Sequence, residues 1–191
     1  MNRLTTFAVA GAAALTLAFA VTTPSPSFAK EMTKMVGGAA MYPSKNIVQN
    51  AVNSKDHTTL VAAVKAAGLV PTLESKGPFT VFAPTNEAFK KLPEGTVQTL
   101  LKPENKDKLK SILTYHVVSG RLTAKDLMEK VKAGGGKAEI KTVEGAPLTI
   151  EAKDGKLWLI DAKGDKAEVT IANVMQSNGV IHVINTVMLP G

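Results

Sequence analysis

The three histidines are the side chains of this 191-residue chain best suited to acid–base or metal chemistry. They lie far apart, at His57, His116 and His182, and the chain has no cysteine. Zinc sites need three or four ligands, usually with some closely spaced, so this set does not indicate a metal centre. A Ser-His-Asp triad assembles only in space and stays open on spacing alone, but no G-x-S-x-G turn presents a serine nucleophile. The sequence therefore supports no catalytic residue and no cofactor, and we expect a protein that is not an enzyme.

Each histidine also fits a structural role. His116 ends an apolar run with i, i+3 and i+4 spacing, which predicts a core histidine, hydrogen-bonded to the backbone, at the end of a buried helix face. His182 lies in "GVIHVINTVMLP", where apolar residues on both faces predict a central strand. His57 follows Asp56 in the polar stretch "SKDHTT", and we expect its side chain to be exposed.

Helical patterns come first along the chain and strand patterns later. The residues expected to cap helices are Ser44, Asp56, Thr85 or Asn86, Thr96 and Thr123, the last in a capping box with Asp126. One early strand is predicted at 79–83, and later strands near 138–143, 147–152, 156–161, 167–174 and 180–189. This order is typical of an α+β domain rather than of repeated βαβ units.

Residues 1–29 have the form of a secretion signal. Arg3 supplies a positive charge, an apolar run follows from Phe7 to Val21, and Ser27-Phe28-Ala29 is a small-x-small cleavage site. The run is shorter than the roughly 20 residues that span a bilayer, so an uncleaved anchor is the weaker alternative. We therefore expect an exported protein, periplasmic or extracellular, with no stable membrane anchor in its mature form. It would consist of an N-terminal arm at 30–45 and one domain at 46–190.

Lysine dominates the positive charge of the chain. Without Arg3, 22 of the 23 Lys and Arg residues remain against 16 acidic residues, so the formal charge falls from +7 to +6. Arg121 is then the one arginine, and aromatic residues make up only 5% of the chain. Nucleic-acid binding is not expected, because base and phosphate recognition favours arginine and stacking favours aromatics. A lysine-rich exterior suits anionic glycans, wall polymers or lipid head groups, and simple solubility is an equally good explanation.

Three stretches together resemble a known family. "TVFAPTNEAF" at 80–89, "LTYHVV" at 113–118 and "NGVIHVINTVMLP" at 178–190 are similar to the two boxes and the Tyr-His element of the fasciclin (FAS1) domain family, in the same order. The resemblance runs from about residue 46 to residue 190. It implies one FAS1 fold, a β-wedge or sandwich of about seven strands with several helices packed around it.

The resemblance also implies roles for particular residues. The residues that carry the fold motif would be Thr80, Phe82, Pro84, Thr85 and His182. Tyr115 and His116 match a pair implicated in partner binding in animal members, although the apolar pattern favours a core position for both. Asn86 and Asn185 stand where aspartate is common in the family, so a charged contact at Asn185 would be lost or neutralised.

Two functions from different classes lead at this point, and a hydrolase using His116 or His182 is a third possibility that we do not expect. Family members are exported or surface-displayed modules, so the resemblance implies a non-enzymatic adhesion or surface-interaction protein that binds an extracellular protein, matrix or anionic polysaccharide of a cell wall. The alternative is a carrier of a small apolar ligand, a pigment or a lipid. Its only support in the sequence is the methionine-rich arm with Met32, Met35, Met41 and Tyr42, since methionine makes adaptable contacts with apolar partners.

Overall fold

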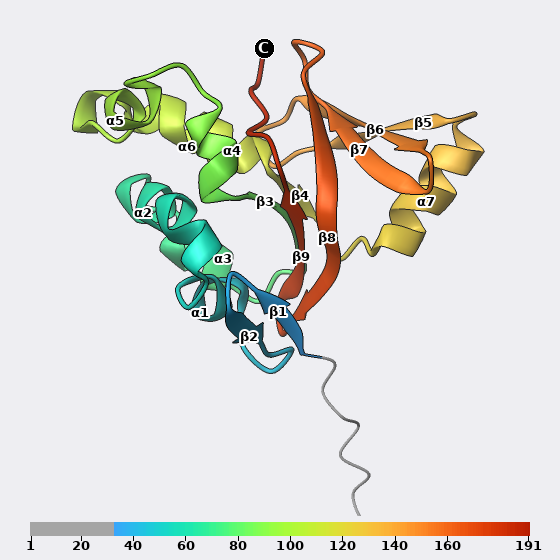
Figure 1. Ribbon diagram of the computed structural model, residues 1–191, viewed down its shortest axis with the longest axis horizontal. Helices are drawn as coiled ribbons and strands as arrows, with labels where there is room; N and C mark the ends of the chain where they lie inside the picture. Colours follow the sequence, from blue (N-terminus) through green and yellow to red (C-terminus); the bar gives the residue numbers. More distant parts are fainter. Residues whose placement is uncertain (1–32) are drawn as a thin grey trace, which may run out of the picture. The chain divides into compact units, whose positions relative to one another are not determined.

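A seven-stranded mixed sheet forms the centre of the structure, a computed structural model that describes residues 33–191 (Figure 1). The strand order is β4-β3-β9-β8-β7-β6-β5. The strands are β3 (Phe79–Pro84), β4 (Val117–Ser119), β5 (Lys137–Lys141), β6 (Pro147–Lys153), β7 (Lys156–Ile160), β8 (Lys166–Gln176) and β9 (Gly179–Ile184). Strands β3 and β9 run parallel and every other neighbouring pair is antiparallel. The predicted α+β class with about seven sheet strands is confirmed.

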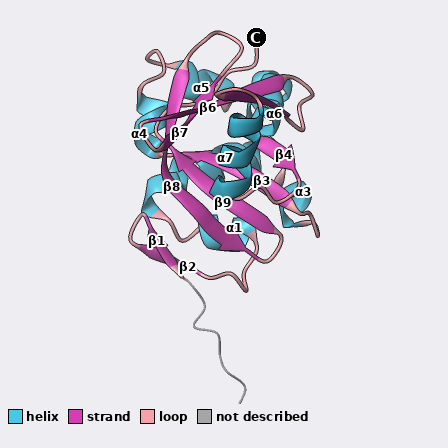
Figure 2. Ribbon diagram, turned by 90° about the vertical axis from the view of Figure 1, so that its right-hand side faces the viewer, coloured by secondary structure: helices cyan, strands magenta, loops and turns pink. Residues whose placement is uncertain are grey.

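The two edges of the sheet approach each other. The backbone N–H groups of Val143 and Glu144, just after β5, donate to the carbonyls of Val117 at 2.7 Å and Thr114 at 3.3 Å. Helix α7 (Ala124–Ala133) packs on β5 and β6, and Figure 2 shows it in front of the strands. Leu127 and Val131 of this helix belong to a buried apolar cluster with side chains from β3, β6, β7 and β9. One core therefore lies inside the curved sheet, closed by α7.

A second core lies on the other face of β3 and β9, beneath the remaining helices (Figure 1). These are α1 (Ile47–Ala51), α2 (Thr58–Ala66), α3 (Val70–Glu74), α4 (Asn86–Lys90), α5 (Thr96–Leu100) and α6 (Lys106–Tyr115), with 3-10 turns at Lys55–His57 and Pro103–Asn105. Their buried side chains share a cluster with Val81, Ile181 and Val183. The central strands are thus apolar on both faces, as the sequence around His182 predicted.

A small hairpin precedes the helices. Strands β1 (Lys34–Val36) and β2 (Ala39–Met41) pair antiparallel within the segment expected to be an N-terminal arm, and Val36 and Met41 are buried. Gly37 adopts a φ of 58° at the turn, and a Cβ there would lie 2.4 Å from Ser54 Oγ. The hairpin therefore sits tightly against the chain just before α2. The predicted secretion signal, residues 1–29, lies outside the described residues.

The helix ends confirm some of the predicted caps and correct others. Thr85 Oγ1 accepts the Ala88 N–H at the start of α4, and Thr123 and Asp126 form the predicted capping box of α7. Three predicted caps are wrong, because α1 is capped by Asn46 instead of Ser44, Asp56 lies inside a 3-10 turn, and Thr96 is the first residue of α5 after Gly95. The last strand ends at Ile184 rather than near 189, and β4 had not been predicted.

Candidate functional site

The parallel pair β3–β9 brings the residues of the fold motif together. Phe82 is in register with His182, and their rings stack with centroids 5.7 Å apart. Thr80, on the same strand as Phe82, donates its hydroxyl to the Gly120 carbonyl at 2.7 Å and accepts the Leu122 N–H at 2.8 Å. Pro84 is the last residue of β3, and Thr85 caps the next helix. The importance of these residues for folding stays a prediction.

His182 is fully buried and both of its ring nitrogens are used. Nδ1 accepts the Asn173 N–H at 3.3 Å, so Nε2 carries the proton and donates to the Leu122 carbonyl at 2.8 Å. Burial lowers the pKa of this imidazole, with the Leu122 carbonyl acting in the opposite direction. The side chain therefore joins β9 to the bulge in β8 and to the segment before α7, and leaves no nitrogen for acid–base chemistry.

The Tyr-His pair at the end of α6 is also inside the protein. His116 Nδ1 donates to the Ile112 carbonyl at 2.8 Å, and Nε2 accepts the Met188 N–H at 3.0 Å. Burial lowers the pKa of His116 to about 4, so the ring is neutral at physiological pH. The prediction of a core histidine bonded to the backbone is confirmed. Tyr115 is fully buried and donates its hydroxyl to the Pro147 carbonyl at 2.9 Å. A role of the pair in partner binding stays a prediction, and the described fold presents neither side chain on its surface.

The expectation that His57 is exposed is wrong. It lies at the end of the 3-10 turn, which places Asp56 outside and the imidazole in the core with 3% of its surface exposed. Its Nδ1 is 2.9 Å from Ser54 Oγ, whereas its Nε2 has no partner within hydrogen-bonding geometry in residues 33–191. Burial lowers the pKa of His57, and a loose hydrogen bond from the ring to the Ala83 backbone and the negative charge of Asp56 only partly offset this effect.

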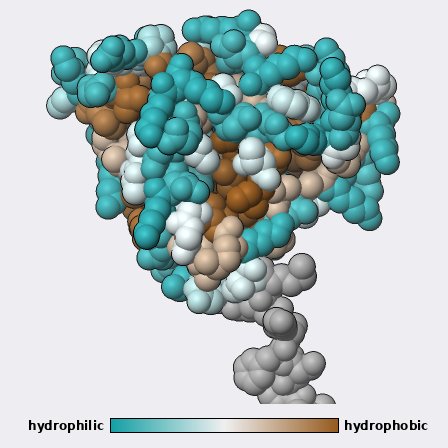
Figure 3. Space-filling view, viewed as in Figure 1, coloured by the Kyte–Doolittle hydropathy of each residue, from teal (hydrophilic) through white to brown (hydrophobic). Residues whose placement is uncertain are grey.

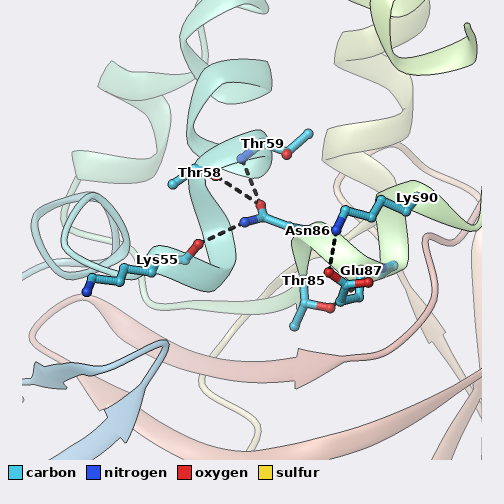
Figure 4. Close-up of polar contacts among 8 residues, drawn as sticks. Lys55, Thr58, Thr59, Thr85, Asn86, Glu87 and Lys90 are labelled. Carbon is cyan, nitrogen blue, oxygen red and sulfur yellow. Dashed lines mark hydrogen bonds and ion pairs between the residues drawn. The ribbon is translucent and has the colours of Figure 1, made fainter.

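Asn86, the first residue of α4, caps the start of helix α2, which lies almost thirty residues earlier in the sequence (Figure 4). Its Oδ1 accepts the Thr59 N–H at 3.0 Å and the Thr58 hydroxyl at 3.2 Å, at the start of α2. Its Nδ2 donates to the Lys55 carbonyl at 2.8 Å. An aspartate, which is acceptor-only when ionised, could not make this last bond. The amide at this position therefore completes the first turn of α2, which has no cap of its own.

Asn185 likewise makes its contacts through an amide oxygen and its backbone carbonyl, not through a carboxylate. Its Oδ1 accepts the Glu168 N–H at 2.9 Å, and its carbonyl accepts from Lys91 Nζ at 2.7 Å. It fastens the end of β9 to β8.

An apolar cavity of about 50 Å³ lies between helices α1, α2 and α3 and the β3–β9 pair. Its polar lining residues are His57, Lys65 and His116, and the others are all apolar. Lys65 is exposed and lies at the mouth, together with the half-buried Val48, Ala51, Val61 and Val70. Both nitrogens of His116 are bonded to the backbone and His57 contacts Ser54, so Lys65 is the polar lining residue that makes no hydrogen bond or ion pair within residues 33–191. Sequence reasoning missed this cavity, since its walls come from elements spread between residues 36 and 181.

The exterior is largely hydrophilic, with hydrophobic residues gathered over β8 and β9 on the face in Figure 3. Within residues 33–191, ion pairs engage four lysines, namely Lys90, Lys125, Lys156 and Lys166. Most of the lysine-rich surface therefore carries unpaired positive charge. The described residues contain no group of three or more acidic or histidine side chains that could hold a metal ion. None of their helices is both long and apolar enough to cross a membrane.

The sheet order and the two cores define a fold already seen in solved structures. The chain superimposes with a TM-score of 0.70 on a FAS1 domain pair from the insect cell adhesion molecule fasciclin I, at 21% sequence identity, over 78% of this chain and 52% of that chain. It thus spans about half of the insect pair. This likeness establishes a FAS1 fold.

The family follows from the sequence comparisons. The fasciclin domain family model matches residues 55–190, so the chain belongs to the fasciclin domain family. It is 49% identical over 176 residues to protein sll1483 of Synechocystis sp., covering 90% of this chain and 91% of that relative. It is 34% identical over 206 residues to the immunogenic protein MPB70 of Mycobacterium bovis, covering 97% and 94%. The likeness to the transforming growth factor-beta-induced protein ig-h3 of Sus scrofa is 39% over 131 residues, 69% of this chain but 17% of that protein.

Proposed function

We propose that the protein is a non-enzymatic, exported surface-interaction module that binds an anionic extracellular polymer, such as a cell-wall polysaccharide, or an extracellular protein partner. The unpaired lysines of the exterior are the observation that carries this proposal, because they attract polyanions without a preformed pocket. Membership of a family that includes an insect cell adhesion molecule also supports it. Export and a periplasmic or extracellular location rest on the secretion signal predicted at residues 1–29.

The lysines around α6 offer the sharpest test of this function. Lys102, Lys108 and Lys110 are exposed and close in sequence. Replacing all three by glutamine should release the protein from cell walls or anionic glycans at lower salt than the wild type. The matched variant with arginine at the same positions keeps the charge and should elute with the wild type. Attraction between exposed charges is screened beyond about 8 Å at physiological ionic strength, so retention that does not respond to salt contradicts the lysine mechanism.

A second candidate function, carriage of a small apolar ligand, is favoured by the cavity beneath α2. Met41, from the methionine-rich segment, is buried and lines this cavity, whereas Met35 points away with 61% of its surface exposed. Met32 lies outside the described residues. Native mass spectrometry and an absorption spectrum of the protein purified from its own host would test the candidate. Co-purified mass or colour supports a carrier, and a bare, colourless protein opposes it.

A further inference from the structure

The outer face of strands β5, β6, β7 and β8, the face turned away from α7, carries the single tryptophan of the chain among charged side chains. We propose that this outer face binds an acidic polysaccharide, with one pyranose ring stacked on Trp158 and the sugar carboxylates held by the surrounding lysines. The inference rests on the proposed surface-interaction function, and it names the surface and the sugar chemistry of the partner.

The strand register sets the composition of the outer face. Side chains directly opposite each other in an antiparallel sheet point to the same side, so the register defines one row across the four strands. Its members are Lys137 on β5, Glu151 on β6, Trp158 on β7 and Glu168 on β8. All four are exposed or half-buried, whereas their neighbours along β6 and β7 are buried in the core closed by α7, namely Ile150, Leu157 and Leu159. The row therefore faces solvent.

Trp158 is the aromatic surface of the outer face. Tryptophan is highly buried on average, yet Trp158 is half-buried and belongs to neither apolar core cluster. The C–H groups of a pyranose ring carry a slight positive charge and pack well against the negative face of an indole ring. A shallow depression of about 410 Å³ lies next to it, lined by Thr149, Ile160 and side chains of β5. This volume is within the range of small-molecule pockets, so the depression has room for a sugar unit beside the stacked one.

Two ion pairs flank Trp158 and supply hydrogen-bonding groups. Glu168 Oε1 is 2.7 Å from Lys156 Nζ, and Glu151 Oε2 is 3.1 Å from Lys166 Nζ. Exposed ion pairs of this kind contribute little to stability, so they can open at small cost. Their carboxylates can then accept hydrogen bonds from sugar hydroxyls, and their ammonium groups can donate to sugar oxygens.

Unpaired lysines make the outer face positively charged. Five lysines stand on it against three glutamates, Glu139, Glu151 and Glu168, which gives a net charge of +2; the lysines are Lys137, Lys141, Lys153, Lys156 and Lys166. The first three take part in no ion pair within residues 33–191. A hydrogen bond from Lys166, together with the charges of Lys137 and Lys153, lowers the pKa of Glu151, so these lysines lie around one point. This charge complements the carboxylates of an acidic polysaccharide.

The fluorescence of the single tryptophan reports the contact directly. Adding polygalacturonate, a polymer of carboxylated pyranose rings, should change the emission of Trp158, and no other indole contributes to that signal. Two further polymers separate ring from charge. Polyglutamate carries carboxylates without sugar rings, and a neutral galactan carries the rings without charge. The wild type should bind polygalacturonate more tightly than either.

Substitution of the ring tests the stacking. Trp158→Val keeps a residue suited to a strand and should weaken polygalacturonate binding roughly tenfold in calorimetric titration, the upper range for an aromatic contact. Binding of polyglutamate should not change. Tyr42→Val, which removes an exposed aromatic residue outside this face, is the matched control and should bind like the wild type. The double variant Lys137→Gln, Lys153→Gln leaves the ring in place and should weaken binding of both polyanions.

Unchanged Trp158 fluorescence with polygalacturonate, or equal affinities of the wild type and Trp158→Val for it, overturns the inference. Polyglutamate or galactan bound as tightly as polygalacturonate also overturns it, because charge or ring alone would then suffice. In each of these cases the proposed function still stands if cell walls retain the protein in a salt-sensitive way that depends on Lys102, Lys108 and Lys110. If they do not retain it, both fall.

Discussion

Acidification between pH 7.5 and 5 should destabilise the protein, because its three histidines are buried in their neutral form. The pKa of His116 falls to about 4 in the folded state, against about 6.5 in the unfolded chain. Above pH 6.5 both states are neutral and stability does not depend on this group. Between pH 6.5 and 4 the unfolded chain binds a proton that the folded protein does not, so the free energy of unfolding decreases as the pH falls. Below pH 4 the folded state is protonated as well and the loss levels off.

The magnitude follows from the two pKa values. At pH 5 the unfolded chain is protonated at this site and the folded protein is mostly not, which amounts to a loss of about 2 kcal/mol for His116. The full loss, reached below pH 4, is about 3 kcal/mol. Burial also lowers the pKa values of His57 and His182, so both act in the same direction. A few kilocalories per mole are a large part of the 5–15 kcal/mol that typically stabilise a domain.

Urea unfolding followed by circular dichroism at half-unit pH steps measures this loss. The window from pH 6.5 to 5 isolates the histidines, since the pKa values of Asp126 and Glu151 are lowered by their hydrogen bonds and these groups affect stability only at lower pH. His116→Gln removes one titrating group and should make the pH dependence shallower. A free energy of unfolding that is unchanged between pH 7.5 and 5, or a variant with the same dependence as the wild type, would refute the reasoning.

Three substitutions test other contacts. His116→Ala should lower stability by about 1–3 kcal/mol in thermal or urea unfolding, because the Met188 N–H and the Ile112 carbonyl lose their partner; unchanged melting would contradict its core role. Asn86→Asp should lower the free energy of unfolding by about 1 kcal/mol, because the hydrogen bond to the residue 55 carbonyl is lost. Amide hydrogen exchange in the first turn of α2 should then become faster. Exchange as slow as in the wild type would count against this cap. Gly37→Ala should destabilise the β1–β2 hairpin, because the new methyl group would clash with Ser54 Oγ and alanine disfavours a φ of 58°. Limited proteolysis should then cleave the chain before α1. Resistance equal to that of the wild type would show that the hairpin tolerates the change.

The structural features that were predicted correctly are mainly those determined by residues close together in the sequence. The capping box of Thr123 and Asp126 and the cap at Thr85 involve residues three apart, so their pattern is visible in the chain itself. The continuous apolar run around His182 correctly indicated a strand buried on both faces, and the three family boxes indicated the FAS1 fold. Local pattern and family resemblance together thus predicted the fold.

The features that were predicted wrongly or missed depend mainly on contacts between residues distant in the sequence. His57 lies in a polar stretch, yet a single 3-10 turn directs its ring into the core, and hydropathy cannot show that rotation. The cap of α2 comes from Asn86, nearly thirty residues later, so no nearby residue could reveal it. Strand β4 has three residues, too few for an alternating pattern to register. The cavity has no signature of its own, because it is the space left where several separate helices and strands meet.

The parallel pairing of β3 with β9 has a consequence for how the protein is made. Strand β9, the last strand in the chain, lies between β3 and β8 at the middle of the sheet and contributes to both cores. A chain emerging from the ribosome therefore lacks the central strand until it is almost complete, and neither core can close before that. Such non-local pairing also slows folding, because the chain must lose the entropy of closing a long loop before the stabilising contacts can form. A truncation that removes β9 should leave two unpaired strand edges rather than a smaller domain. If residues 1–29 act as the predicted secretion signal, late closure would favour export, because a chain that is threaded through a membrane as an extended polypeptide must still be unfolded.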